Sequence, residues 1–300
     1  MELQFRHLGK LFKATFKSWN DKDPFRQSAV IAYYAIFSIP GLLVLIIAIT
    51  GYFFGRDAVN ENILKQISNT LGAETAKAMG EMLTKASQSG SSVIGSIVSI
   101  GVLLVGATGV FVELQKSLND IWHVKPVKQN GVWLVVKARL FSFGLIVAIA
   151  FLLLVSLVVS TGLTALSDLI KGYTSDFTVV IFNIINFFFS LAVISLLFSM
   201  MYKILPDAKI EWKHVWVGSF ITGLLFTIGK TALAFYFGTA NPGSVYGAAG
   251  SVILMLLWVS YSSMIVFFGA EFTAAYARRY TGKVPPMENA KSVPAESTKK

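Results

Sequence analysis

The sequence contains no cysteine, and only 14% of its 300 residues are charged. The lack of cysteine excludes disulfides, thiolate metal ligands and cysteine nucleophiles. A soluble domain carries about 25% charged residues, so the low charge content argues against a soluble fold. Instead, 54% of the residues are hydrophobic and the mean hydropathy is +0.64. This composition predicts a membrane protein.

Long apolar runs predict an all-α, polytopic membrane protein with six transmembrane helices. Each run exceeds the roughly 20 residues that cross about 30 Å of hydrocarbon. The runs lie at residues 28–54, 91–118, 140–163, 178–204, 215–238 and 245–275. They define a transmembrane domain over residues 28–276.

The lysine and arginine residues predict the orientation of these helices. Of the 26 basic residues, 20 lie in the two terminal segments and in the second-to-third and fourth-to-fifth connections. Five lie on the opposite side, and Lys230 lies inside the fifth span. The positive-inside rule then places both termini in the cytoplasm. The C-terminal tail, residues 277–300, is polar and contains three prolines, so we expect it to be disordered.

Two segments outside the spans have helical spacing. Residues 1–27 predict a basic amphipathic helix, which either lies flat on the anionic inner leaflet or packs on the cytoplasmic ends of the spans. Residues 55–90 predict short amphipathic helices over the outer, periplasmic mouth of the bundle. The apolar stripe of the first helix consists of Leu8, Leu11, Phe12, Phe16 and Trp19.

No motif of an enzyme is present. The three histidines, His7, His123 and His214, lie in separate segments without metal-ligand spacing. There is no paired-carboxylate nuclease motif and no Walker A loop. We therefore expect no metal site, no cofactor and no catalytic residue. The basic excess follows from the topology, so it does not indicate a nucleic-acid partner.

Lys230 is the strongest candidate for binding because an ammonium group at the bilayer centre costs about 2.5–3.5 kcal/mol. It lies about 12 Å short of the outer end of its span. Three polar side chains share its expected depth and join it as candidate substrate-binding residues, namely Asn183, Asn186 and Ser99. Lys230 either faces a functional cavity in the bundle, lined by these side chains, or extends toward the outer headgroups.

Further polar residues are expected near the cytoplasmic ends of the spans. This inner polar layer consists of Tyr33, Tyr34, Glu113, Arg139 and Glu271. It either belongs to a gated pathway or anchors helix ends at the interface, and we expect at least one arginine–carboxylate contact within it. Pro40 and Gly41, in the middle of the first span, form a candidate hinge.

Four stretches together resemble the YihY/virulence factor BrkB family of bacterial inner-membrane proteins. They are "QSAVIAYYAIFSIPGLLVLI" at 27–46, "VFVELQKSLNDIWHV" at 110–124, the stretch from "MYKILPDAK" to "FYF" at 201–237, and the stretch from "SVYGAAG" to "AYA" at 244–277. The resemblance covers nearly the whole chain. It implies six helices with cytoplasmic termini, in a bacterial inner membrane. It also implies a link to the cell envelope, and that the ribonuclease label once given to the family is an error.

From the residues and the resemblance, we expect a transporter-like protein that moves or handles a lipid or another amphiphilic envelope component. The alternative is a scaffold that does not transport and docks envelope partners through residues 55–90. Membrane lipids are the expected partners in the first case. A homo-oligomer or an envelope protein partner stays open in both.

Overall fold

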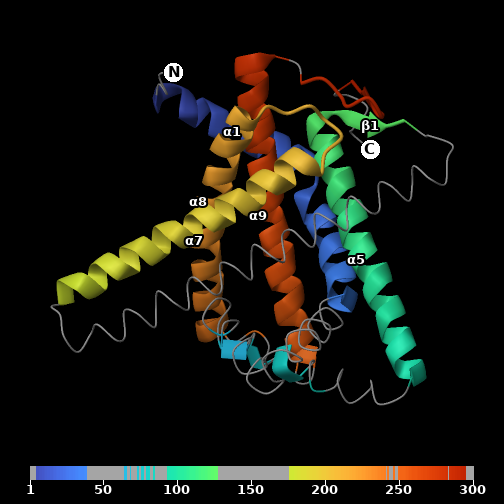
Figure 1. The fold of residues 1–300 in the computed structure, drawn as a ribbon, viewed down its shortest axis with the longest axis vertical. Coiled ribbons are helices and arrows are strands. Elements are labelled where there is room, and N and C mark those ends of the chain that lie inside the picture. Colours follow the sequence, from blue (N-terminus) through green and yellow to red (C-terminus); the bar gives the residue numbers. More distant parts are fainter. Residues whose placement is uncertain are drawn as a thin grey trace. The chain divides into compact units, whose positions relative to one another are not determined.

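The structure is a computed structural model in which long helices dominate (Figure 1). It describes residues 5–38, 93–127, 176–240, 251–282 and 284–294, with short pieces between 64 and 84 and between 242 and 250. The helices are α1 (Phe5–Asp21), α5 (Val93–Trp122), α7 (Asp176–Ile204), α8 (Trp212–Ala240) and α9 (Gly250–Thr281), and the strands are β1 (Val124–Pro126) and β2 (Ala290–Ser292). Residues 24–38 are also helical.

Three helices of the described residues are long and apolar enough to cross a membrane. These candidate spans are Ile184–Ile204, Trp212–Ala240 and Val252–Thr281. They fall on the fourth, fifth and sixth predicted spans, where the structure thus has helices able to cross a membrane. The second predicted span falls on α5, and the helical residues 28–38 begin the first. The rest of the first span, with Pro40 and Gly41, and the third span lie outside the described residues.

The chain forms two compact units. The first contains Met1–Lys22, Leu118–Leu225 and Phe268–Lys300, and the second contains Asp23–Ser117 and Phe226–Phe267. The first unit therefore holds α1, both short strands, α7 and the ends of α5, α8 and α9 that adjoin the connecting loops.

In the first unit, α7, α8 and α9 pack closely because glycines line the contact. The fully buried Tyr202 donates its hydroxyl to Thr222 Oγ1 over 3.2 Å. A Cβ on Gly269 would collide with both of these side chains, and one on Gly218 would collide with Thr273. Glycine at these two positions thus allows α9 to approach the other helices.

In the second unit, α5 packs against the helical residues 24–38. A Cβ added to Gly106 would lie 3.0 Å from the backbone oxygen of Tyr34, and one added to Gly109 would collide with the Tyr34 ring. The ring of Tyr34 therefore fills space that a larger residue in α5 would need. Tyr33, its neighbour, is 59% exposed.

Helix α1 packs on the end of α9 in the first unit. Leu11 is 7% exposed and forms a buried cluster with Phe272 and Tyr276. The ring of Phe12 lies 5.1 Å from the ring of Phe272. This contact agrees with one of the two expected positions of the first helix, namely packing on the ends of the spans.

Residues 284–294 form a defined segment, which corrects the expectation of disorder for that part of the tail, while residues 295–300 lie outside the description. Helix α9 continues to Thr281, and Gly282 follows with a φ of 80°. Within this C-terminal segment, β2 pairs antiparallel with β1, and Pro286 forms an isolated bridge with Ala208. The prolines and charges of this segment suggested disorder. Its order comes from pairing with β1, which lies far earlier in the chain and could not be foreseen from the local composition.

Candidate functional site

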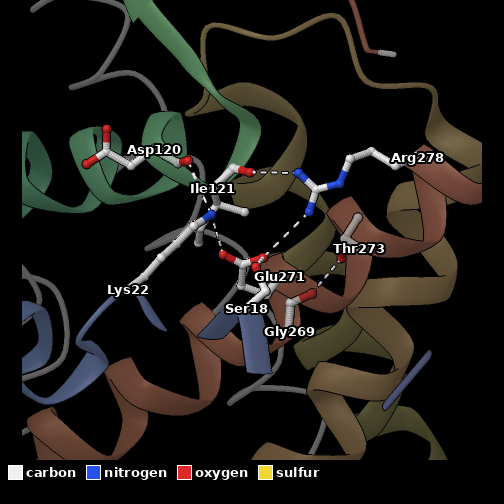
Figure 2. Close-up of polar contacts among 8 residues, drawn as sticks. All are labelled: Ser18, Lys22, Asp120, Ile121, Gly269, Glu271, Thr273 and Arg278. Atoms are coloured by element: carbon white, nitrogen blue, oxygen red, sulfur yellow. Dashed lines mark hydrogen bonds and ion pairs between the residues drawn. The ribbon is translucent and has the colours of Figure 1, made fainter. Parts of the chain in front are cut away.

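A buried carboxylate lies at the centre of the polar contacts in the first unit (Figure 2). Glu271 is 1% exposed. Ser18 Oγ donates to its Oε2 over 3.0 Å, Lys22 Nζ lies 2.5 Å from its Oε1, and Arg278 Nη2 lies 3.7 Å from its Oε2. We name these four residues the Glu271 cluster. Two cations around one carboxylate leave the cluster with a net positive charge.

The two cations of the cluster also contact the C-terminal end of α5. Lys22 Nζ donates to the carbonyl of Asp120 over 3.3 Å, and Arg278 Nη1 donates to the carbonyl of Ile121 over 3.4 Å. The last carbonyls of a helix have no partner within the helix, and they carry the negative end of its dipole. Cations from two other segments thus cap α5, and Glu271 holds both cations in place.

The sequence brings these side chains together through helical periodicity. Ser18 lies in the last turn of α1 and Lys22 directly follows that helix, four residues later, while Glu271 and Arg278 are seven apart on α9. Both spacings place side chains on one face of a helix. His123 follows α5 with a φ of 53°, a left-handed conformation that ends the helix.

Burial changes the ionisation of two groups at this end of α5. It lowers the pKa of Lys22 below the usual 10.5, and the Glu271 carboxylate opposes that shift. The pKa of His123 is lowered to about 4, first by burial and then by the positive charges of Lys22 and Arg278. His123 is therefore neutral at physiological pH, while the two cations face the carboxylate.

A second polar cluster ties the α7–α8 loop to the end of α5. Asn119 Nδ2 donates to Asp207 Oδ2 over 2.8 Å, and the backbone amide of Asp207 donates to Asn119 Oδ1 over 2.7 Å. Asn289 Nδ2 from the C-terminal segment donates to Asp207 Oδ1 over 3.2 Å. We name these three residues the Asp207 cluster. Both acidic clusters join segments that are distant in the sequence.

Two acidic residues of the expected inner polar layer have partners among the described residues. Glu271 does contact an arginine, but this arginine is Arg278 of the same helix, while Arg139 lies outside the described residues. Glu113 lies 3.6 Å from Lys116, one turn later in α5. Lys22 was missed because its position at the end of α1 gives no sign of its contact with α9.

Lys230 is half-buried in α8, in the second unit. Among the described residues, no hydrogen bond or ion pair reaches its ammonium group. Of its three expected neighbours, Asn183 and Ser99 lie in helices, but their side chains are outside the description. Asn186 is half-buried in α7, in the first unit.

The side of α8 that carries Lys230 is also the side that packs. Phe237, seven residues later and about 20° away around the helix, is 1% exposed. The preceding residue, Gly229, faces Tyr261 and Ile265 of α9. By contrast, Ile228 is 66% exposed, and it lies about 160° from Lys230 around the helix.

Small residues recur every fourth position along α8, at Ser219, Gly223, Thr227 and Thr231, a pattern typical of a packed helix face. This stripe is packed at its start alone. Ser219 and Gly223 are buried, Thr227 is half-buried and Thr231 is exposed. A spacing of four residues turns by about 40° at each step. Over three steps the stripe therefore rotates out of the contact, and Phe237 marks the packed face better.

No group of three or more histidine or acidic side chains in the described part of the chain is placed to hold a metal ion. The buried acids instead face cations, amides and backbone groups. Residues 55–90, the expected docking segment, lie largely outside the description. The apolar helices and their polar ends together define a multi-pass membrane protein.

The chain belongs to the virulence factor BrkB family, whose pattern matches residues 15–294. A UPF0761 membrane protein of Saccharophagus degradans is 24% identical over 275 residues, which are 91% of this chain and 60% of that protein. One of Pseudoalteromonas atlantica is 27% identical and covers 88% of this chain and 85% of its own length. A ribonuclease-like protein, YfkH, of Bacillus subtilis is 26% identical over 92% of this chain and 98% of its own length. No solved structure matches the chain.

The structure gives physical reasons for two of the stretches that carry the family resemblance. In "MYKILPDAK", Tyr202 contacts α8 and Asp207 binds the end of α5. In "FFGAEF", Gly269 allows the close approach of α9 to α8, and Glu271 forms its cluster. These residues build the polar end of the first unit.

Proposed function

We propose that this membrane protein moves or handles an anionic amphiphile, a lipid or an envelope precursor, and that Lys230 holds its charged headgroup. The observation that supports this is a half-buried lysine in an apolar helix, with no ion pair or hydrogen bond from any described residue. A charge in the hydrocarbon region is costly and marks a functional site by default.

The position of Lys230 around α8 favours binding over extension toward the headgroups of the surrounding lipid. Lys230 shares its side of the helix with the buried Phe237, and it lies away from the exposed Ile228. A headgroup phosphate or carboxylate next to this side of α8 would form an ion pair with the ammonium group, which binds phosphate as a point charge.

The test compares Lys230→Met, which keeps the length and removes the charge, with Lys230→Arg, which keeps the charge. Native mass spectrometry of gently solubilised protein counts bound anionic lipids, and an envelope-stress assay reports function. We expect the methionine variant to lose both bound anionic lipid and function at normal expression, and the arginine variant to keep most of both. Full function and unchanged lipid binding in Lys230→Met would refute the proposal.

A further inference from the structure

Helix α1 presents three different faces. Counted at 100° per residue from Leu11, Thr15 and Ser18 lie within about 40°, and this core face also carries Lys22. The core face contacts α9: Leu11 is 7% exposed, Thr15 is fully buried and Ser18 binds Glu271.

The second face of α1 is aromatic. Trp19, Phe12 and Phe16 lie about 80° to 140° from Leu11. Phe12 is 37% exposed and Phe16 is 58% exposed. The aromatic face borders the contact with α9, because Trp19 and Phe12 both meet the ring of Phe268, at 6.0 and 6.2 Å.

The third face of α1 is basic. Lys13, Lys17 and Lys10 lie about 200° to 260° from Leu11, and all three are exposed. No acidic residue interrupts this face between Phe5 and Trp19. The helix therefore has a core face, an aromatic face and a basic face, each about a third of its circumference.

The contact with α9 sets the depth of α1 in the membrane. From Gly250 to Ala270, α9 has no charged residue, and these 21 residues measure about 31 Å, close to the thickness of the hydrocarbon core. Glu271 is the first charge. The ring of Phe12 stacks on that of Phe268 and lies tilted against that of Phe272, so α1 crosses α9 where the hydrocarbon ends and the headgroups begin.

We propose that α1 is an interfacial helix that docks on an anionic lipid leaflet. Phe16 lies at the boundary of the acyl chains, Lys10, Lys13 and Lys17 bind anionic headgroups, and the core face stays on α9. Interfacial amphipathic helices carry Trp, Phe and Leu on the face that enters the acyl boundary. Each basic residue beside anionic lipid strengthens binding about fivefold. This proposal stands independently of the role of Lys230.

The absence of cysteine from the chain permits a clean test with spin labels. Phe16→Cys labels the aromatic face and Lys10→Cys, about 120° away, labels the basic face. The labelled full chain is placed in nanodiscs with or without anionic phospholipid. Collision with oxygen, which enters lipid, is compared with collision with a water-soluble nickel complex.

In anionic nanodiscs, we expect the label at position 16 to meet oxygen and be protected from nickel, and the label at position 10 to show the reverse. Combining F16C with K13Q and K17Q should reduce the protection, because two charges contribute roughly 30-fold in binding. Equal nickel access at both positions would overturn the proposal and leave the aromatic face for a protein partner. If the protection at position 16 is the same with and without anionic lipid and with and without the two lysines, the proposed binding of headgroups by the basic face is wrong.

Discussion

Glu271→Gln tests whether the Glu271 cluster holds α1, α5 and α9 together. The substitution keeps the shape and an acceptor for Ser18, but it leaves Lys22 and Arg278 without their carboxylate. Breaking a buried pair costs about 3–5 kcal/mol. We expect about 3 kcal/mol, because the side chains of Lys22 and Arg278 keep 14% and 35% exposure and recover some hydration.

A double-mutant cycle separates the ion pair from the loss of packing. Lys22→Met alone leaves Glu271 with Ser18 and Arg278, and Lys22→Met combined with Glu271→Gln leaves no uncompensated carboxylate. The double variant should therefore be less destabilised than the sum of the single variants, by about 1–3 kcal/mol. Equilibrium unfolding in mixed detergent micelles, followed by circular dichroism, measures each free energy. Strictly additive costs, or a Glu271→Gln variant as stable as the wild type, would refute the role given to the cluster.

Three further predictions concern pH, the Asp207 cluster and topology. Because the pKa of His123 is lowered to about 4 from the unfolded value near 6.5, the unfolded chain binds more protons between these values. The free energy of unfolding should thus rise with pH from about 4 to 6.5, with a shallower slope in His123→Asn, which tolerates the left-handed backbone. Asn119→Ala should lower the free energy of unfolding by about 3 kcal/mol, because it removes both hydrogen bonds to Asp207, and should raise hydrogen exchange in residues 284–294. Asn289→Ala should lower it by about 1 kcal/mol. Equal hydrogen exchange in the two variants would contradict this order. A reporter fused after Lys300 should report a cytoplasmic location, and a reporter inserted at residue 75 should report a periplasmic one. A periplasmic C-terminus would reverse the assigned sides.

The membrane helices of the described region follow from the sequence because hydrocarbon imposes a local rule. A run of about 20 apolar residues satisfies its own backbone hydrogen bonds as a helix, so α7, α8 and α9 fall on predicted spans. A glycine such as Gly269 is typical of close helix packing in membranes, but its contacts with Tyr202 and Thr222 depend on the fold.

The polar contacts could not be predicted in the same way, because they join residues far apart in the chain. Glu271 was expected at the end of its span, but nothing in the sequence around it names Lys22 as its partner. The C-terminal segment shows the same limit: its composition resembles a disordered tail, and its order depends on β1 and Asp207. Periodicity indicates which face of a helix packs, but it does not indicate against what.

The bond between Ser18 and Glu271 has a consequence for the order of events during synthesis. The two residues are 253 positions apart. A ribosome that adds about 5–20 residues per second makes Glu271 roughly 10–50 s after Ser18. During that interval the core face of α1, with Lys22, has no α9 to pack on. We expect the newly made helix to rest on the leaflet through Phe16 and its lysines until α9 inserts beside it.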